Sequence, residues 1–276
     1  MSAARFLCVG THHKTGTVWL RRTLHRIMER QGIPLMQINR AKRIADLPEH
    51  GPQIVVNWSS GYPPEVFALP EARFIHVIRD PRDVLLSGAR YHEKAPLGNE
   101  NFLKKQRPEW GGLNYKDYLK SLETPQEKLL FEMENKHAST LFEMLAWPYG
   151  HPSAVELRYE DLMEDHECRQ FRSALERCAI QGLDIDGAVQ AFWDSSLFGG
   201  LKKEGERPNR IVNHVTSGTG AEAQWRTKMP RSVARRYAAR YGSALAALGY
   251  AEDDSWVDLC PEDEALAEAQ EAVAAK

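Results

Sequence analysis

The sequence predicts a single α/β domain, doubly wound and P-loop-like, in which helices flank a central parallel sheet. Short apolar runs alternate along the chain with segments of helical periodicity. The first run and the first helical segment enclose a polar loop that contains lysine and glycine. The 276 residues, 42% of them hydrophobic, suffice for one large α/β core or two small ones. Because strands alternate with helices, a parallel sheet with right-handed crossovers is expected.

The predicted elements follow in chain order. Apolar runs predict strands at 5–10, 53–58, 74–79 and 154–159, and apolar residues at helical spacing predict helices at 17–31, 162–178 and 232–248. The polar stretch 91–126 is weakly periodic, so we expect a long lid-like insertion on the acceptor side. The domain then covers 1–251, and the acidic, alanine-rich segment 252–276 is expected to be a solvated helix or a frayed end.

Net charge and cysteine content limit the possible ligands and the cellular location of the protein. A net charge of -2 gives no global attraction to nucleic acid or to an anionic membrane, so an anionic ligand requires a local basic pocket. The four cysteines lie far apart and form no CxxC pair, which predicts reduced thiols. No apolar stretch reaches the roughly 18 residues that span a bilayer. We therefore expect a cytoplasmic protein without a membrane span and without a nucleic-acid partner.

The loop after the first predicted strand has the composition of an oxyanion site. It runs G-T-H-H-K-T-G-T-V-W-L from Gly10, directly into the first predicted helix. Amide groups and the helix dipole would converge on one spot, Gly16 would allow close approach, and Lys14 would add a charge. A Walker A loop needs its lysine after the second glycine, whereas Lys14 precedes Gly16 by two residues. This order, with no Walker B run, weakens the alternative of a P-loop small-molecule kinase.

Two motifs together carry a family resemblance. The segment K-T-G-T-V-W-L resembles the 5′-phosphosulfate loop of the sulfotransferases that use 3′-phosphoadenosine-5′-phosphosulfate (PAPS). The segment R-D-P-R-D-V-L-L-S resembles the family's 3′-phosphate motif, with Arg79 and Ser87 at the same spacing. Arginine offers bidentate hydrogen bonds to a phosphate, and serine adds a short donor. The resemblance implies binding of the phosphosulfate by loop residues and of the 3′-phosphate by Arg79 and Ser87. The implied loop residues are Lys14, Thr15, Gly16, Thr17 and Val18.

Weaker matches extend the resemblance over roughly residues 5–250. Tyr159 begins a Y-E-D-L segment, Ser196 and Phe198 lie in an S-L-F segment, and Gly218 begins a G-T-G-A-E-A-Q-W segment. The resemblance implies that Trp19, Tyr159 and Phe198 surround adenine, that Ser196 bonds near it, and that the Gly218 loop closes on the 3′-phosphate.

The Gly218 segment departs from the family pattern. Thr216 and Ser217 stand where the family has arginine and lysine, so two expected cations are absent. Either phosphate binding is weaker, or Arg210, Lys202 or Arg226 substitutes for them.

The implied reaction is in-line transfer of a sulfuryl group from PAPS to a hydroxyl or amine of a small-molecule or glycan acceptor. The product is 3′-phosphoadenosine-5′-phosphate (PAP), Lys14 stabilises the transferring group, and no metal is expected. The family's Lys-Thr-His, whose histidine is the general base, is replaced by V-N-W at 56–58. The nearest substitutes are His12 and His13 beside the loop, then His92 and Glu65.

The missing base leaves three possibilities open. Another group serves as base, the acceptor needs no strong base, or the chain is a weakly catalytic or non-catalytic nucleotide-binding module. Aromatic and polar side chains are candidates for an acceptor pocket, although they are equally expected to pack the insertion. These candidates are Trp58, Ser59, Tyr62, Trp110 and Tyr115. Neither the acceptor nor the oligomeric state can be predicted from the sequence.

Overall fold

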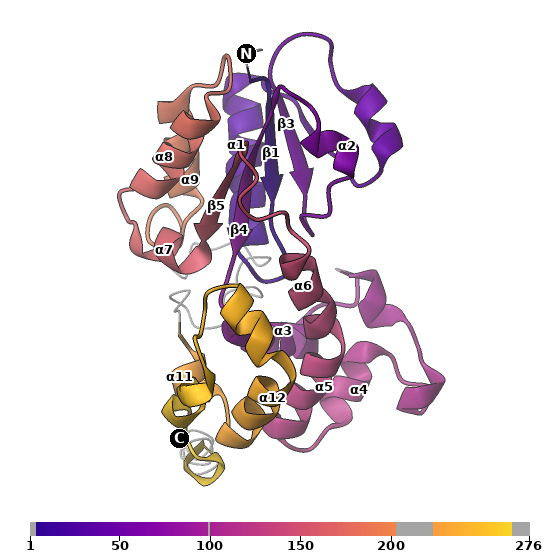
Figure 1. Ribbon diagram of the computed structural model, residues 1–276. Coiled ribbons are helices and arrows are strands. Elements are labelled where there is room, and N and C mark those ends of the chain that lie inside the picture. Colours follow the sequence, from indigo (N-terminus) through magenta and orange to yellow (C-terminus); the bar gives the residue numbers. More distant parts are fainter. Residues whose placement is uncertain (1–3, 99, 203–222, 267–276) are drawn as a thin grey trace. The chain divides into compact units, whose positions relative to one another are not determined.

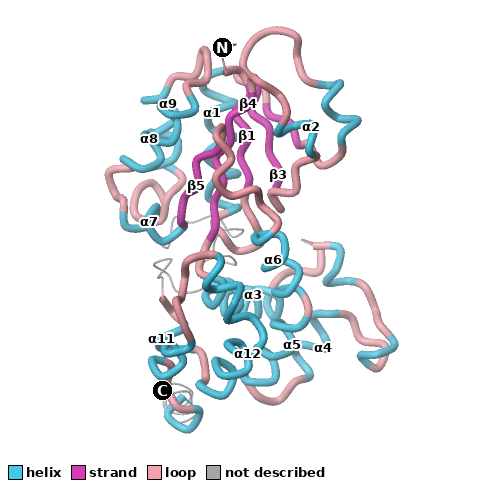
Figure 2. The backbone as a smooth tube through the Cα atoms, in the orientation of Figure 1, coloured by secondary structure: helices cyan, strands magenta, loops and turns pink. Residues whose placement is uncertain are grey.

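The computed structural model describes residues 4–98, 100–202 and 223–266 (Figure 1). The described chain groups into two compact units. The first unit contains residues 4–79 and 146–202, and the second contains residues 80–98, 100–145 and 223–266. The named strands all belong to the first unit, and the second consists of helices and loops (Figure 2).

A five-stranded sheet forms the centre of the first unit. Its strands are β1 (Phe6–Gly10), β2 (Leu35–Gln37), β3 (Gln53–Asn57), β4 (Ala72–Ile78) and β5 (Ala154–Arg158). All neighbours are parallel, in the order β2-β3-β1-β4-β5. At the end of β1, Gly10 is in register with Asn57 of β3 and with His76 of β4. The loops that leave β1 and its neighbours therefore begin at the same edge of the sheet.

Helices cover both faces of this sheet. They are α1 (Thr17–Gln31), α2 (Pro64–Phe67), α7 (Tyr159–Glu164), α8 (Arg169–Cys178), α9 (Ile185–Asp194) and the 3₁₀ helix η1 (Ala41–Asp46). Leu7 and Val9 of β1 belong to the core formed with α1, α8 and α9, whereas Phe6 and Cys8 belong to the core on the α2 side. Figure 1 shows α8 and α9 on one side of the sheet and α2 on the other. This period-2 alternation of two apolar faces is typical of a buried central strand.

The predicted strands and the first helix are confirmed, and two local predictions are wrong. The short strand β2 was not predicted, because it has only three residues, of which Leu35 and Met36 are partly buried and Gln37 is exposed. The single helix predicted at 162–178 is instead two helices, α7 and α8. Cys168 breaks it with a φ of 58°, and the Asp165 carboxylate accepts a hydrogen bond from the Gln170 amide (2.5 Å) at the start of α8.

The second unit is a set of packed helices. They are α3 (Pro81–Lys94), α4 (Tyr115–Ser121), α5 (Pro125–Glu134), α6 (Lys136–Leu145), α11 (Trp225–Lys228), α12 (Arg231–Ala247) and the 3₁₀ helices η2 (Asn101–Lys104), η3 (Pro108–Trp110) and η5 (Asp254–Leu259). Helix α12 confirms the predicted helix at 232–248. No helix in the described residues is both long and apolar enough to cross a membrane.

The described part of the segment 91–126 has a small core of its own. Tyr91, Leu103, Tyr115 and Leu119 are buried there, and Trp110 packs against them. The role of this segment as a lid stays a prediction. The start of the predicted acidic tail is also folded, because η5 buries Trp256 to 5% exposure.

Candidate functional site

The loop between β1 and α1 turns sharply through two residues with left-handed backbone. Lys14 has a φ of 65° and Gly16 a φ of 95°. Gly16 is the N-cap residue of α1 and provides no side-chain cap. A Cβ at this position would lie 3.1 Å from the ring of Tyr159. Glycine is therefore required both by the backbone and by the neighbouring ring.

The internal hydrogen bonds of the loop converge on the backbone of His12. Its carbonyl accepts from the Thr15 amide (3.2 Å), the Thr15 hydroxyl (3.0 Å) and the Thr17 hydroxyl (2.7 Å). The His12 amide donates to Thr15 Oγ1 (2.8 Å), and Thr17 Oγ1 also contacts Thr11 Oγ1 (2.9 Å). The hydroxyls of Thr15 and Thr17, two of the residues predicted to bind the phosphosulfate group, thus shape the loop itself.

Arg79 follows β4 and contacts this loop. Its Nη1 donates to the carbonyl oxygen of Lys14 (3.2 Å), and its Cζ lies 4.5 Å from the centroid of the Tyr159 ring. The side chain is buried, with 5% of the residue exposed. The first unit therefore brings together Lys14, Arg79 and Tyr159, which the sequence placed in three separate motifs.

The three aromatic residues predicted around adenine are neighbours. Trp19 meets Tyr159 edge-on at 6.5 Å and Phe198 at 5.7 Å between centroids. It also stacks on Phe192 at 4.2 Å, and its indole N–H donates to the Phe192 carbonyl (3.1 Å). Phe192 was not predicted, because a phenylalanine on the buried face of an amphipathic helix is indistinguishable in sequence from ordinary core. Adenine binding by this cluster stays a prediction.

The other residues predicted to contact the nucleotide do not belong to this aromatic cluster. The Ser196 hydroxyl donates to the Trp193 carbonyl (2.8 Å) and accepts from the Gly199 amide (2.8 Å), so it stabilises a turn. Val18 is half-buried on α1. Ser87 belongs to α3 of the second unit and is 3% exposed. Gly218 and Arg210 lie outside the described residues.

A second buried histidine, which the sequence analysis missed, contacts the loop. His76 Nε2 lies 2.8 Å from His12 Nε2, and both residues are fully buried. The His76 ring also stacks on Trp147, with 4.0 Å between centroids and 16° between planes. Burial, and then the nearby His12, hold the pKa of His76 well below its ordinary value. His76 and His12 are 64 residues apart, and the register of β1 with β4 brings them together.

The residues at the family's base position are structural. Asn57 Nδ2 donates to the carbonyls of Ile38 (2.9 Å) and Gly61 (3.0 Å), and its Oδ1 accepts from the Ser59 amide and hydroxyl (both 3.1 Å). The Cζ of Arg21 lies over the ring of Trp58, 5.0 Å from its centroid. These contacts close the turn after β3.

Most of the other candidate side chains pack into a core. Tyr62 is buried and donates its hydroxyl proton to the Val55 carbonyl (3.1 Å). Trp110 and Tyr115 belong to the small core of the second unit. Glu65 is exposed on α2. For the three aromatic residues, the structure favours the packing interpretation over an acceptor pocket.

In the second unit, His92 is part of a buried polar cluster. Its Nδ1 lies 2.8 Å from Glu132 Oε2, which also accepts the hydroxyl proton of Tyr115 (2.8 Å). Glu132 is 1% exposed, and a Cβ on Gly88 would lie 2.8 Å from its Oε1. Burial and the neighbouring carboxylate raise the pKa of Tyr115, so Tyr115 stays a neutral donor.

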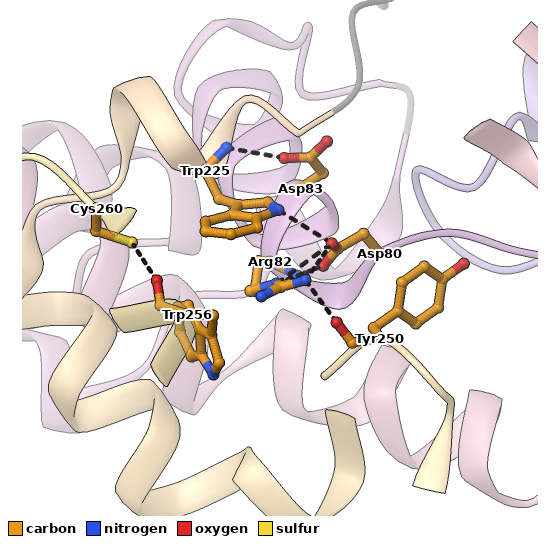
Figure 3. A network of polar contacts seen from close by, with 7 residues as sticks. All are labelled: Asp80, Arg82, Asp83, Trp225, Tyr250, Trp256 and Cys260. Atoms are coloured by element: carbon orange, nitrogen blue, oxygen red, sulfur yellow. Dashed lines mark hydrogen bonds and ion pairs between the residues drawn. The ribbon is translucent and has the colours of Figure 1, made fainter. Parts of the chain in front are cut away.

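The start of α3 anchors the chain that follows the Gly218 segment. Arg82 donates from Nε (2.9 Å) and Nη2 (2.7 Å) to the Asp80 carboxylate, and its Cζ lies over the rings of Trp225 (3.9 Å) and Trp256 (4.8 Å) (Figure 3). Trp225 in turn donates its indole N–H to Asp80 (3.1 Å) and its amide to Asp83 (3.0 Å). Trp225, the last residue of the predicted Gly218 motif, is thereby fixed within the second unit.

Comparison with solved structures identifies the fold. The structure is similar to that of mouse sulfotransferase SULT7A1 complexed with PAP, with a TM-score of 0.54 over 91% of this chain and 88% of that chain. The chain has the sulfotransferase fold. It is also similar to retinol dehydratase in complex with androsterone and inactive cofactor PAP, with a TM-score of 0.52 over 89% of this chain and 82% of that chain.

Sequence identity to these two proteins is low, at 14% and 13%. No protein-family model matches the sequence, and no curated protein matches it. The sulfotransferase fold confirms the predicted α/β class with its central parallel sheet. The individual contacts described above therefore carry the functional argument.

Proposed function

We propose that the protein is a sulfotransferase that moves the sulfuryl group of PAPS to a hydroxyl or amine of a small-molecule or glycan acceptor. The observation that carries the proposal is the β1–α1 loop, which combines the N-terminus of α1, a left-handed Lys14 and a contact with Arg79. A helix N-terminus beside two cationic side chains favours a ligand with several negative charges.

In the proposed reaction, an acceptor oxygen or nitrogen attacks sulfur in line with the leaving phosphate. A new bond to sulfur forms, the bond from sulfur to the bridging oxygen breaks, and its electron pair remains on the 5′-phosphate of PAP. Lys14 and the amides of residues 15–18 stabilise the charge on the bridging oxygen and the sulfonate, as in phosphoryl transfer. The acceptor proton passes to a base, and the mechanism needs no metal.

The nucleotide part of the proposal uses the aromatic cluster and Arg79. Trp19, Tyr159 and Phe198 would hold adenine, and Arg79 would hold the 3′-phosphate. The roles of Ser87 and the Gly218 segment at the 3′-phosphate stay predictions from the sequence. The position of Arg79 against Tyr159 supports this assignment, because one side chain links the phosphate loop to the adenine cluster.

For the base we propose His13, which is half-buried in the loop. His12 was an equal candidate, but its ring is fully buried and its Nε2 contacts His76. His92, with its Nδ1 on Glu132, is the next candidate. Loss of a general base lowers turnover by roughly 10²- to 10⁴-fold, so His13→Ala should reduce kcat within that range without preventing PAP binding.

The first test is thermal unfolding with PAP, AMP, ADP and ATP-Mg, followed by transfer of radiolabelled sulfate from PAPS to an acceptor panel. At about 100 times its Kd, PAP should stabilise the protein by roughly 2.7 kcal/mol. Lys14→Ala and Arg79→Ala should remove this effect while remaining folded. Tight PAP binding without transfer to any acceptor would favour the nucleotide-binding module. A larger effect of ATP-Mg would favour the kinase.

We also propose a cytoplasmic location. All four cysteines are free and buried, as expected in a reducing compartment. Burial raises the pKa of Cys178 to about 12 and that of Cys168 to about 11, which keeps both thiols protonated and unreactive.

A further inference from the structure

We propose that the buried His12–His76 couple is a positioning device, in which His76 holds the β1–α1 loop in the form that binds the phosphosulfate group. This inference rests on the proposed function and deepens it. It assigns a role to His76, which lies on β4 and belongs to none of the phosphate motifs.

The first support is the central place of His12 within the loop. The amide and hydroxyl of Thr15 and the hydroxyl of Thr17 all donate to its carbonyl oxygen. A displacement of His12 would therefore disturb both threonines, of which Thr17 is the first residue of α1. The amides proposed to bind the sulfonate are those of the same short stretch.

The second support is the rigidity of the group that holds the His12 ring. His76 lies in a seven-residue strand, in register with Gly10 at the end of β1. Its ring stacks on Trp147, and the indole N–H of Trp147 donates to Glu156 of β5 (3.3 Å). The sheet thus fixes His76, and His76 fixes the ring of His12 through the 2.8 Å contact between their Nε2 atoms.

The third support is the chemistry of this contact. Two Nε2 atoms at this distance share one proton, so one ring donates and the other accepts. An apolar partner cannot replace this bond, because it has no atom that could donate a hydrogen bond to the Nε2 of His12 or accept one from it. The lowered pKa of His76 is consistent with a neutral His76 ring at pH 7.

The main variant for the test is His76→Phe, which keeps an aromatic ring against Trp147 and removes the hydrogen bond to His12. His76→Gln is the conservative variant, because its amide can still bond to His12. His137→Phe is the matched control, since His137 is also a fully buried histidine with a single Nε2 contact, to the Tyr237 hydroxyl (2.9 Å), in the second unit.

We expect His76→Phe to raise the Kd for PAP and the KM for PAPS at least tenfold, with the KM for the acceptor unchanged. His76→Gln should stay within about threefold of the wild-type Kd. His137→Phe should lower Tm and leave the Kd for PAP unchanged. Normal PAP binding by His76→Phe, or equal weakening by His137→Phe, would overturn the inference.

Two further measurements keep the inference testable if His76→Phe does not fold. The double variant His12→Phe with His76→Phe removes both polar atoms, which is much less destabilising than removing one, and it should still bind PAP at least tenfold more weakly. Hydrogen exchange of the Thr15 amide should be faster in the nucleotide-free double variant than in wild-type protein, because this amide donates to the His12 carbonyl. Wild-type protection of the Thr15 amide in the double variant would overturn the inference. Wild-type protein that does not bind PAP would refute the proposed function, whereas wild-type binding with an unaffected double variant would refute only this inference.

Discussion

Arg79 and Arg82 are three residues apart, yet the two units use them in different ways. In the first unit, Arg79 donates to a neutral carbonyl of the β1–α1 loop and lies over the ring of Tyr159. In the second unit, Arg82 is paired with the Asp80 carboxylate and enclosed by two tryptophans. Glu132 of the second unit is likewise bonded to His92 and Tyr115. The second unit thus uses its buried charges to stabilise its own fold, whereas the first unit gathers cationic groups around a loop suited to an anion.

The largest expected effect tests whether the Arg82 contacts stabilise the fold. Arg82→Ala leaves the Asp80 carboxylate buried without its ion-pair partner, so the free energy of unfolding should fall by about 3–5 kcal/mol. The matched control is Arg107→Ala, because Arg107 also pairs with a carboxylate, that of Glu109 (3.1 Å), and lies near the ring of Trp110 (5.1 Å), but its side chain is 45% exposed. Exposed pairs contribute about 0–1 kcal/mol. Urea denaturation of both variants measures the contrast, and equal losses would contradict it.

The next effect concerns pH and His137. Burial lowers the pKa of His137 from 6.5 to about 4, although the Glu132 carboxylate opposes the shift. Because the unfolded chain then binds more protons, stability should be lost as pH falls from about 6.5 to 4 and should stay constant above pH 7. The shift corresponds to a loss of about 3 kcal/mol.

The pH dependence of unfolding in wild-type protein and His137→Gln measures this contribution. The variant should lose less stability between pH 7 and 4 than the wild type does. The pKa of His76 in the first unit is also lowered. Protonation of His76 should therefore also destabilise the protein at low pH, and part of the dependence of stability on pH should remain in the variant. A variant with the full wild-type slope would show that His137 does not titrate as described.

A smaller effect separates backbone strain from loop function. Gly16→Ala places a Cβ at a φ of 95°, which costs about 1–2 kcal/mol, and presses it against Tyr159 at 3.1 Å. Gly32→Ala has similar backbone strain at a φ of 68°, with nothing within 4 Å of the new Cβ. Gly16→Ala should lose at least as much stability in urea as Gly32→Ala, but only Gly16→Ala should weaken PAP binding in calorimetry. Weaker binding by both would mean that helix α1 as a whole, and not the loop, governs the site.

The smallest expected effect is local to the second unit. Thr124 and Glu127 form a capping box at the start of α5, in which each side chain bonds to the backbone of the other. Thr124→Ala should lower the free energy of unfolding by about 1 kcal/mol. PAP binding should not change, because the capping box is exposed and belongs to none of the phosphate motifs. An altered Kd for PAP would instead connect the start of α5 with the nucleotide site.

Local patterns predicted much of the fold because they depend on near neighbours in sequence. Helix α1 has the predicted bounds, and Gly32 ends it with a left-handed backbone. The break between α7 and α8 was missed because Cys168 has no residue-type preference for the left-handed conformation it adopts. The wider context of the chain imposes that conformation.

The sequence by itself determined the position of the β1–α1 loop, the Arg79 motif and the alternation of strands and helices, since each depends on residue type and short spacing. Only the tertiary structure decided what the side chains of these motifs contact. His12, a candidate base in sequence, is tied to His76, and Trp19 is tied to Phe192 across 173 residues. Arg82, three residues after Arg79, is enclosed by tryptophans from the C-terminal part of the chain. Such contacts depend on strand register and helix packing, which bring distant residues together and leave no periodic pattern in the sequence.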